Sequence, residues 1–469
     1  MLFNTFNFWI VFPFIFIFYW LIPSNKYHLK KLFLIVISYL LYINYNATYT
    51  LILLYVTLVT YVSAKILENI NYQRRTLIII GATLTLGPLV IFKYYNFITE
   101  NINKILSLSG LKFNLSGLNW IIPLGISFFT FQALGYLWDV YYRKIKAEKS
   151  LIDYMIFISF FPQIASGPIS KASELFPQIK QFHPFNFKQA VEGLKLLLWG
   201  MFLKVVIADR LGLYVDTVYN SYEHQSGITC LIASIFYSIQ IYGDFAGYSF
   251  MAIGISKTLG FNLINNFKRP YFAISVTDFW KRWHISLSRW LKDYIYIPIG
   301  GNKCNRLRNY WNIIITFIIS GIWHGANWTF IIWGLLHGIF QILEKALGLQ
   351  KYAGNNKVVK VVRICITFIL IDFAWIFFRM PNPNSAYDII IKIFTEFNGI
   401  IYKTSNTNTL LYFIGILILL SKDFIDEFYI NKFSFLNKKT VKWIIYLILF
   451  AMIIGIGVLD SGQFIYANF

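Results

Sequence analysis

The sequence predicts an all-α polytopic membrane protein. Hydrophobic residues make up 57% of the 469-residue chain and charged residues only 13%, about half the charged share of a typical soluble domain. Apolar stretches long enough to cross a bilayer recur from one end of the chain to the other. Between them there is no linker rich in glycine, proline and serine and no long polar segment, so residues 1–469 are expected to form a single membrane domain.

The apolar stretches are taken in chain order as candidate membrane helices. They lie at 7–23, 32–45, 48–64, 77–95, 120–142, 151–167, 191–213, 228–256, 311–333, 334–347, 360–380, 409–421 and 441–459. A helix needs about 20 residues to cross a bilayer, so the shorter stretches are expected to be re-entrant or paired, leaving roughly 11 crossings. The first stretch has no basic segment before it and no small-residue cleavage site after it, and is expected to be a retained span.

The net charge of +21 is explained better by membrane topology than by nucleic-acid binding. Basic clusters at 26–31, 74–75 and 143–149 follow the first, third and fifth stretches, whereas the segment after the second is uncharged. Positive charge gathers on the cytoplasmic side of membrane proteins. These loops are therefore expected to be cytoplasmic and to contact anionic lipid.

Several kinds of active site are disfavoured by the motifs. The cysteines Cys230, Cys304 and Cys365 are scattered, and no histidine pair has zinc-site spacing. Neither a phosphate-binding G-x-x-x-x-G-K-[ST] loop nor a G-x-S-x-G nucleophile elbow occurs. We therefore expect no metal site and no bound cofactor.

The segment "DFWKRWHISLSRWLKDYIYIPIGGN" (278–302) is predicted to be a long interfacial amphipathic helix that ends near Pro298. At helical spacing an apolar, mostly aromatic face is formed by Trp280, Trp283, Leu287, Trp290, Leu291 and Tyr294. The basic residues of the opposite side are Lys281, Arg282, Arg289 and Lys292. His284 falls at the edge of the aromatic face, where it is either a functional group turned inward or ordinary amphipathic filling.

His324, in "SGIWHGANWTF" (320–330), falls near the middle of the stretch 311–333. An ionisable side chain at membrane depth is costly and usually faces the protein interior or a wet cavity. On a continuous helix, Ser320, Gly321 and Asn327 share its face, and the small residues leave room for a ligand. An imidazole there can accept a proton from a hydroxyl and return it to a leaving group. The alternative is a buried histidine bonded to a neighbouring helix.

Three further ionisable residues lie inside apolar stretches. His337 is turned to roughly the opposite face from His324 on a straight helix, and is interpreted as structural. Asp244 and Asp372 could each orient a histidine, pair with an arginine or line a polar path.

Four stretches carry a resemblance to a known family: "FFPQIASGPISK" (160–171), "QIYGDFAGYSFMAIGISKTLGF" (240–261), "FWKRWHISLSRWLKDYIYIPIGGN" (279–302) and "SGIWHGANWTFIIWGLLHG" (320–338). Together they resemble the membrane-bound O-acyltransferase family, in the branch of alginate and peptidoglycan O-acetyltransferases. The resemblance runs over nearly the whole chain, and the two histidine motifs make it specific.

The resemblance implies roles for individual residues. His324 corresponds to the family's catalytic histidine and His284 to its second functional position. Asn327 is typical of the branch and is expected to donate a hydrogen bond to a developing oxyanion. Residues expected to line the substrate path are Ser320, Trp323 and Asp244.

The resemblance also implies direct transfer of an acyl group, most simply acetyl, from a thioester to a hydroxyl, with no acyl-enzyme. Acetyl-CoA or an acyl carrier protein would supply it from the cytoplasm. The basic residues expected to bind this donor are Lys281, Arg282, Arg289 and Lys292. The protein would lie in the bacterial cytoplasmic membrane and serve a cell-envelope polysaccharide, with an extracytoplasmic SGNH-type acetyltransferase as its partner.

Three other functions remain open. The D-alanyl transferases of teichoic acid belong to the same family and differ in the group transferred. A transporter or flippase could use His324, Asp244 and Asp372 as a proton path, although each histidine motif occurs once and transporters often show internal repeats. A scaffold that recruits the extracytoplasmic enzyme would not need His324.

Overall fold

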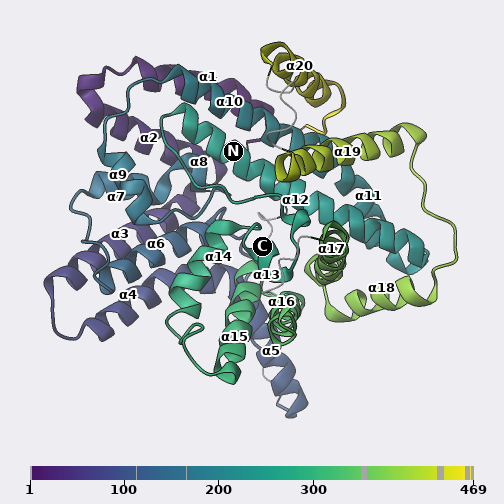
Figure 1. Ribbon diagram of the computed structural model, residues 1–469. Coiled ribbons are helices and arrows are strands. Elements are labelled where there is room, and N and C mark those ends of the chain that lie inside the picture. Colours follow the sequence, from purple (N-terminus) through teal and green to yellow (C-terminus); the bar gives the residue numbers. More distant parts are fainter. Residues whose placement is uncertain are drawn as a thin grey trace. The chain divides into compact units, whose positions relative to one another are not determined.

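The computed structural model describes residues 3–111, 114–164, 166–349, 356–429, 438–459 and 465. Within these ranges every regular element is a helix (Figure 1), which confirms the predicted all-α class. The α-helices are α1 (Phe6–Leu21), α2 (Tyr27–Tyr45), α3 (Ala47–Asn69), α4 (Arg74–Leu89), α5 (Tyr95–Leu108), α6 (Ile126–Tyr141), α7 (Leu151–Ser159), α8 (Phe161–Ile164), α9 (Ala172–Lys180), α10 (Phe187–Met201), α11 (Asp209–Asn220), α12 (Gly227–Thr258), α13 (Val276–Trp280), α14 (Ile285–Leu291), α15 (Arg306–His324), α16 (Trp328–Ala346), α17 (Lys357–Arg379), α18 (Pro383–Thr395), α19 (Asn406–Phe428) and α20 (Lys439–Ile456).

Six helical segments among the described residues are long and apolar enough to cross a membrane, which confirms a multi-pass membrane protein. They are Ala47–Asn69, Arg74–Leu108, Gly227–Thr258, Lys357–Arg379, Asn406–Phe428 and Lys439–Ile456. The segment Arg74–Leu108 joins α4 and α5 through the π-helical turn η2 (Val90–Tyr94). The expected number of crossings, about 11, stays a prediction.

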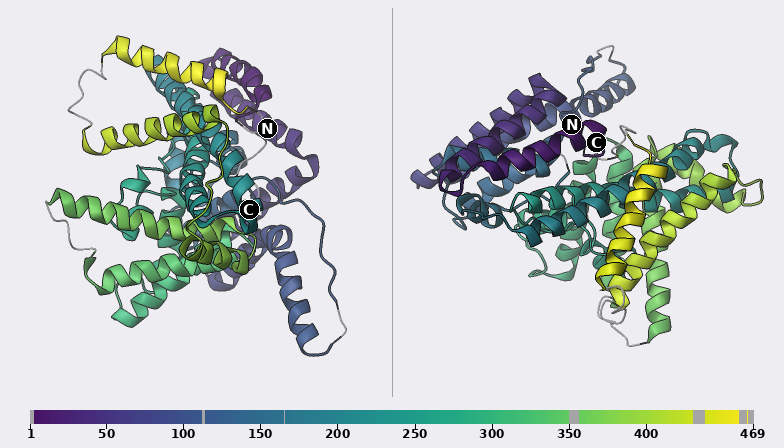
Figure 2. Two further views of the ribbon diagram at one scale, coloured as in Figure 1. Left: turned by 90° about the vertical axis from the view of Figure 1, so that its right-hand side faces the viewer. Right: turned by 90° about the horizontal axis from the view of Figure 1, so that it is seen from above.

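The described chain divides into two compact units, one of residues 3–193 with 252–264 and one of residues 194–251 with 265–465. The expectation of one domain over 1–469 stays a prediction. In the first unit, α3, α4 and α6 pack on one another, and α7 packs on α2 and α9. Helix α5 projects away from α3 and α4 (Figure 2).

Two buried threonine hydroxyls of α3 are satisfied by the backbone of their own helix. Thr57 and Thr60 of α3 each donate to the carbonyl four residues earlier, at 2.7 Å. The Thr60 hydroxyl also lies 2.6 Å from the hydroxyl of Tyr154 on α7. An apolar helix can therefore carry threonines through a buried interface, because each hydroxyl has a backbone acceptor within reach.

In the second unit, α15 and α16 form a tightly packed pair (Figure 1). A Cβ atom added to Gly321 would lie 2.2 Å from the carbonyl oxygen of Phe330, and one added to Gly334 would lie 2.3 Å from that of Phe317. Only glycine permits this approach of the two backbones, as is common between membrane helices. The pairing fixes the short turn between the helices, where His324 lies.

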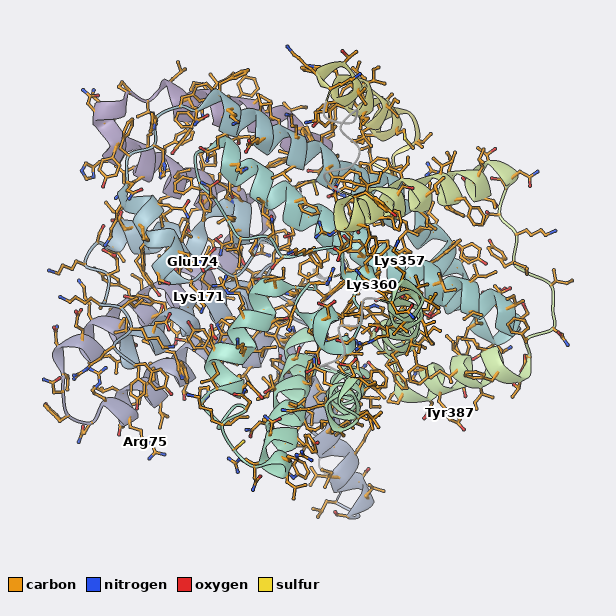
Figure 3. All side chains as sticks on the ribbon, in the orientation of Figure 1. Arg75, Lys171, Glu174, Lys357, Lys360 and Tyr387 are labelled. Carbon is orange, nitrogen blue, oxygen red and sulfur yellow. The ribbon has the colours of Figure 1, made fainter. Side chains whose placement is uncertain are left out.

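The beginning of α17 lies close to the end of α19. Figure 3 labels Lys357 and Lys360 at the beginning of α17, and the Lys360 ammonium lies 4.4 Å from the ring centroid of Phe428, the last residue of α19. Helices α19 and α20 both pack on the π-helical turn η3 (Phe202–Ala208).

The prediction of one continuous helix over 278–302 is wrong. Helix α13 ends at Trp280, and His284 then adopts a left-handed backbone with φ of 43° before α14 begins at Ile285. After α14 the chain forms the π-helical turn η6 (Lys292–Tyr296). The break is tertiary in origin: the Ile285 amide donates to the carbonyl of Asn266 at 3.0 Å, and the Ser286 amide donates to the Asn266 side chain at 3.1 Å.

The prediction of a continuous stretch over 311–333 is also wrong, because α15 ends at His324 and α16 begins only at Trp328. Asn327 is the N-cap of α16, and its side chain accepts from the Thr329 amide at 3.0 Å. Asparagine is a strong N-cap, which stabilises a new helix start at this point. His324 therefore lies at a helix end, and Asn327 does not share a helical face with it.

Candidate active site

His324 is held at the end of α15 by a collar of aromatic rings. Its ring centroid lies 4.9 Å from that of Trp323, 4.9 Å from that of Trp333 on α16 and 5.2 Å from that of Phe378 on α17. The side chain is 1% exposed. Three helices thus fix the position of one imidazole, as a catalytic group requires.

His284 approaches the same collar from the turn between α13 and α14. Its ring lies 4.6 Å from Phe245 of α12 and 5.7 Å from Trp323, and the side chain is completely buried. Burial lowers the pKa of His284 to about 3, so the ring is neutral at physiological pH. The structure therefore brings His284, Trp323 and His324 together, although their roles stay predictions.

His337 lies on α16, four residues after the collar residue Trp333. The Nε1 of Trp280 donates a hydrogen bond of 3.2 Å to the Nδ1 of His337. The His337 ring also lies 4.8 Å from Trp333 and 6.1 Å from Phe317. These contacts join α13, α15 and α16, as expected of the structural residue that the sequence predicts.

A cavity of about 580 Å³ is lined by sequence neighbours of the two histidines, among them Ile285, but not by His284 or His324 themselves. The predicted donor-binding residues Lys281, Arg289 and Lys292 line it, and Lys281 and Lys292 are exposed. Ser320, which is 1% exposed and one helical turn before His324, lines it as well. The cavity therefore extends from exposed cations to a buried position close to the catalytic candidate.

Arg282, also predicted to bind the donor, is not among the residues that line this cavity. Its guanidinium pairs instead with Asp278 at 3.0 Å and with Glu427 of α19 at 3.0 Å. Glu427 also pairs with Arg269 at 2.7 Å. These pairs tie the chain immediately before His284 to α19, which gives Arg282 a structural role at this site.

Lys345 lines the cavity but was missed by the sequence reasoning. It stands four residues after Gln341, another lining residue, so the two share one face of α16. Its ammonium donates to the side-chain oxygen of Asn309 on α15. The sequence signal for this polar face was a glutamine and a lysine four residues apart near the end of an apolar stretch.

Asn327 and the two buried acids have partners elsewhere. The Asn327 amide donates to the carbonyl oxygen of Pro381 at 2.6 Å in addition to capping α16, so its predicted oxyanion role stays a prediction. Asp244 pairs with Lys204 at 2.6 Å, and Lys204 also pairs with Asp209 at 2.6 Å. Asp372 accepts from Ser234 at 2.8 Å and from Ser238 at 2.5 Å.

The fold and the site define a helical membrane protein with a buried histidine cluster beside a cation-lined cavity. Comparison with known sequences shows to which family such a protein belongs. The sequence model of the membrane-bound O-acyltransferase family matches residues 8–386. The chain belongs to the membrane-bound O-acyltransferase family, and the prediction of an O-acyltransferase is confirmed.

Relatives with more specific names extend this result. The "Peptidoglycan O-acetyltransferase" of Helicobacter pylori is 38% identical over 398 residues, covering 79% of this chain and 74% of the relative. The "Probable alginate O-acetylase AlgI" of Pseudomonas aeruginosa is 34% identical over 370 residues, covering 78% of this chain and 70% of the relative. The "Teichoic acid D-alanyltransferase" of Bacillus subtilis is 28% identical over 273 residues, covering 55% and 69%.

Proposed function

We propose that this chain transfers an acetyl group from a cytoplasmic thioester donor across the membrane for O-acetylation of a cell-envelope polysaccharide, with His324 as the general base. The observation that carries the proposal is the cavity that extends from the exposed Lys281 and Lys292 to Ser320, one helical turn from His324. The two relatives named as O-acetylating enzymes support acetyl as the group and peptidoglycan or an alginate-like polysaccharide as the final acceptor.

Acetyl transfer to a hydroxyl requires one base next to a bound thioester. The imidazole of His324 accepts the proton of the acceptor's hydroxyl group. The hydroxyl oxygen then forms a bond to the thioester carbonyl carbon. The carbon–sulfur bond then breaks, and the leaving thiolate takes up the proton from the imidazolium. The histidine returns to its starting state, and the acetyl group has moved from sulfur to oxygen without an acyl-enzyme.

The cations suit an anionic donor at the outer end of the cavity. Coenzyme A and the prosthetic group of a carrier protein both carry phosphate, which lysine and arginine attract. Lys281, Arg289 and Lys292 would hold the phosphates. The apolar wall formed by Ile313 and Phe317 would contact the slender arm that ends in the thioester.

The partner and the location follow from where the acceptor lies. The donor is cytoplasmic and an envelope glycan lies on the other side of the cytoplasmic membrane, so the acetyl group leaves this chain on the far side of the bilayer. An SGNH-type acetyltransferase outside the membrane would complete the delivery to the sugar.

The test is mild-base release of ester-linked acids from the envelope polysaccharide of cells that carry either the wild type or His324→Ala. We expect acetate from the wild type and its loss from the variant at equal membrane level. His224→Gln is the matched control, because His224 is an exposed histidine of the short turn Tyr222–His224. Equal acetate from His324→Ala would contradict the proposal, and loss of D-alanine instead would assign the chain to D-alanyl transfer.

A further inference from the structure

Two neighbouring lysines at the beginning of α2 are both buried but are stabilised in different ways. Lys30 is 7% exposed and Lys31 is 6% exposed. The Lys31 ammonium pairs with the carboxylate of Asp153 on α7 at 2.5 Å. The Lys30 ammonium has no carboxylate or hydrogen-bond acceptor among the described residues and lies instead over aromatic rings.

The rings around Lys30 form a fixed cage. Its ammonium lies 4.4 Å from the ring centroid of Trp20, 5.0 Å from that of Tyr19 and 5.9 Å from that of Phe182. The Trp20 indole donates to the carbonyl oxygen of Thr258 at 3.0 Å, which locks the orientation of its ring. The cage is therefore built by tertiary contacts of the first unit.

The cage satisfies only part of what a buried ammonium requires. Ring faces attract a cation, but an ammonium carries three N–H donors that need oxygen or nitrogen acceptors. The Lys30 ammonium keeps some access from outside, so these donors are open to a ligand. An oxygen-rich anion at Lys30 would supply both the acceptors and the opposite charge.

A small cavity of about 20 Å³ lies beside Lys30 and gives an anion a place to enter. Its lining includes Lys30, Lys31, Gln181 and His183. This volume admits a group of one or two oxygen atoms, since one water needs about 10–15 Å³ by this measure. One end of a larger anion fits here, with the remainder outside.

Exposed aromatic side chains at the cage indicate the nature of the part of the anion that stays outside the cavity. Phe182 is 45% exposed and Phe185 is 51% exposed. The Phe185 ring lies 5.1 Å from Trp20 and 6.2 Å from Phe16 of the apolar helix α1. Aromatic residues gather at the headgroup level of membranes, where one side is apolar and the other polar.

We propose that Lys30 is the phosphate-binding residue of a specific site for an anionic phospholipid. One or two phosphate oxygens enter the cavity and accept hydrogen bonds from the Lys30 ammonium inside the cage of Tyr19, Trp20 and Phe182. The acyl chains of the lipid pack on the exposed faces of Phe182 and Phe185. The site lies in the first unit and is separate from the histidine cluster.

Native mass spectrometry of the purified full chain in mild detergent tests this site, with phosphatidylglycerol as the probe. We expect Lys30→Met to weaken the tightest phosphatidylglycerol site by at least about fivefold, the usual effect of one basic residue on anionic lipid. The matched control is Lys26→Met, because Lys26 is an exposed lysine four residues earlier. Lys30→Arg keeps the charge and is expected to keep most of the affinity.

Competition on the wild type separates the sources of binding and does not depend on how well a variant folds. Diacylglycerol, which lacks phosphate, and glycerol phosphate, which lacks acyl chains, should each compete far more weakly than phosphatidylglycerol. Diacylglycerol competing as well as phosphatidylglycerol would overturn the role of phosphate, and glycerol phosphate competing as well would overturn the lipid. Unchanged affinity in Lys30→Met would overturn the site.

Discussion

The ring of Trp323 lies 5.7 Å from that of His284, with the two planes at 66°. Trp323 is also the chain neighbour of His324, whose ring lies 4.9 Å away. One tryptophan therefore joins the two histidine motifs, which are far apart in the sequence. The position of each imidazole depends on this side chain.

Trp323 should be a positioning residue. Trp323→Ala would open a cavity between the two rings and let both imidazoles shift, and a misplacement of about 1 Å can lower activity about 100-fold. Trp323→Phe keeps a ring there and should retain most of the activity. Acetate release per unit of folded protein measures both variants. Wild-type activity in Trp323→Ala would contradict the role.

The hydrogen bond from Trp280 to His337 should serve stability. Trp280→Phe leaves the His337 Nδ1 without its donor, and an unsatisfied buried acceptor costs about 1–3 kcal/mol. The melting temperature in detergent should therefore fall. Trp443→Phe is the control, because Trp443 is 59% exposed on α20. An unchanged melting temperature in Trp280→Phe would show that the bond contributes nothing.

The cations of the cavity should act on donor binding more than on the chemical step. Arg289→Gln should raise KM for the thioester donor by about two- to fivefold, the effect of a single solvent-accessible ion pair. It should also weaken the dependence of KM on salt. Lys303→Gln, at an exposed lysine outside the cavity lining, should change neither. A fall in kcat at unchanged KM would rule out a donor-binding role for Arg289.

Ser320 should tolerate a smaller side chain but not a larger one. Its hydroxyl has no hydrogen-bond partner within the described residues, so Ser320→Ala removes a group that stabilises little and should stay active. Ser320→Leu places bulk where the thioester would pass and should lower kcat at least about tenfold. Steady-state kinetics on both variants decides the point, and a fully active Ser320→Leu would place the path elsewhere.

His284 should make the protein less stable in acid. The folded ring takes a proton only near pH 3, whereas in the unfolded chain a histidine does so near pH 6.5. Between these values the unfolded state binds the additional proton. The contribution of His284 to the free energy of unfolding should thus fall by about 1.4 kcal/mol per pH unit as the pH decreases.

Melting temperatures measured from pH 7.5 to 4.5 test this linkage. The decline should be shallower in His284→Gln than in the wild type. His224→Gln, at an exposed histidine, is the matched control. Parallel slopes for His284→Gln and the wild type would show that His284 does not titrate in this way.

Composition and periodicity predicted the all-α membrane class because burial in lipid requires long apolar helices whatever their packing. The two helix breaks at the site were missed. The break after His324 had a local signal, since Gly325 precedes Asn327, a strong N-cap residue. The break at His284 depends on a residue distant in sequence, because the carbonyl and the side chain of Asn266 accept from the amides of Ile285 and Ser286.

The partners of charged residues were equally beyond local reasoning. Arg282 falls on the same basic face as Lys281 at helical spacing, yet its guanidinium pairs with Glu427 of α19. A pairing between segments so far apart in the sequence depends on the tertiary arrangement alone. The cavity lining contributed by Lys345 depends in the same way on how α16 packs against α15.

His324-dependent transfer from a thioester is tested most directly in inside-out membrane vesicles. Acetyl-CoA labelled in the acetyl group is added at the exposed cytoplasmic face, and base-labile label in the envelope glycan is measured. We expect label with the wild type and a fall of at least about 100-fold with His324→Ala at equal protein level. Equal labelling with the two proteins would contradict the account.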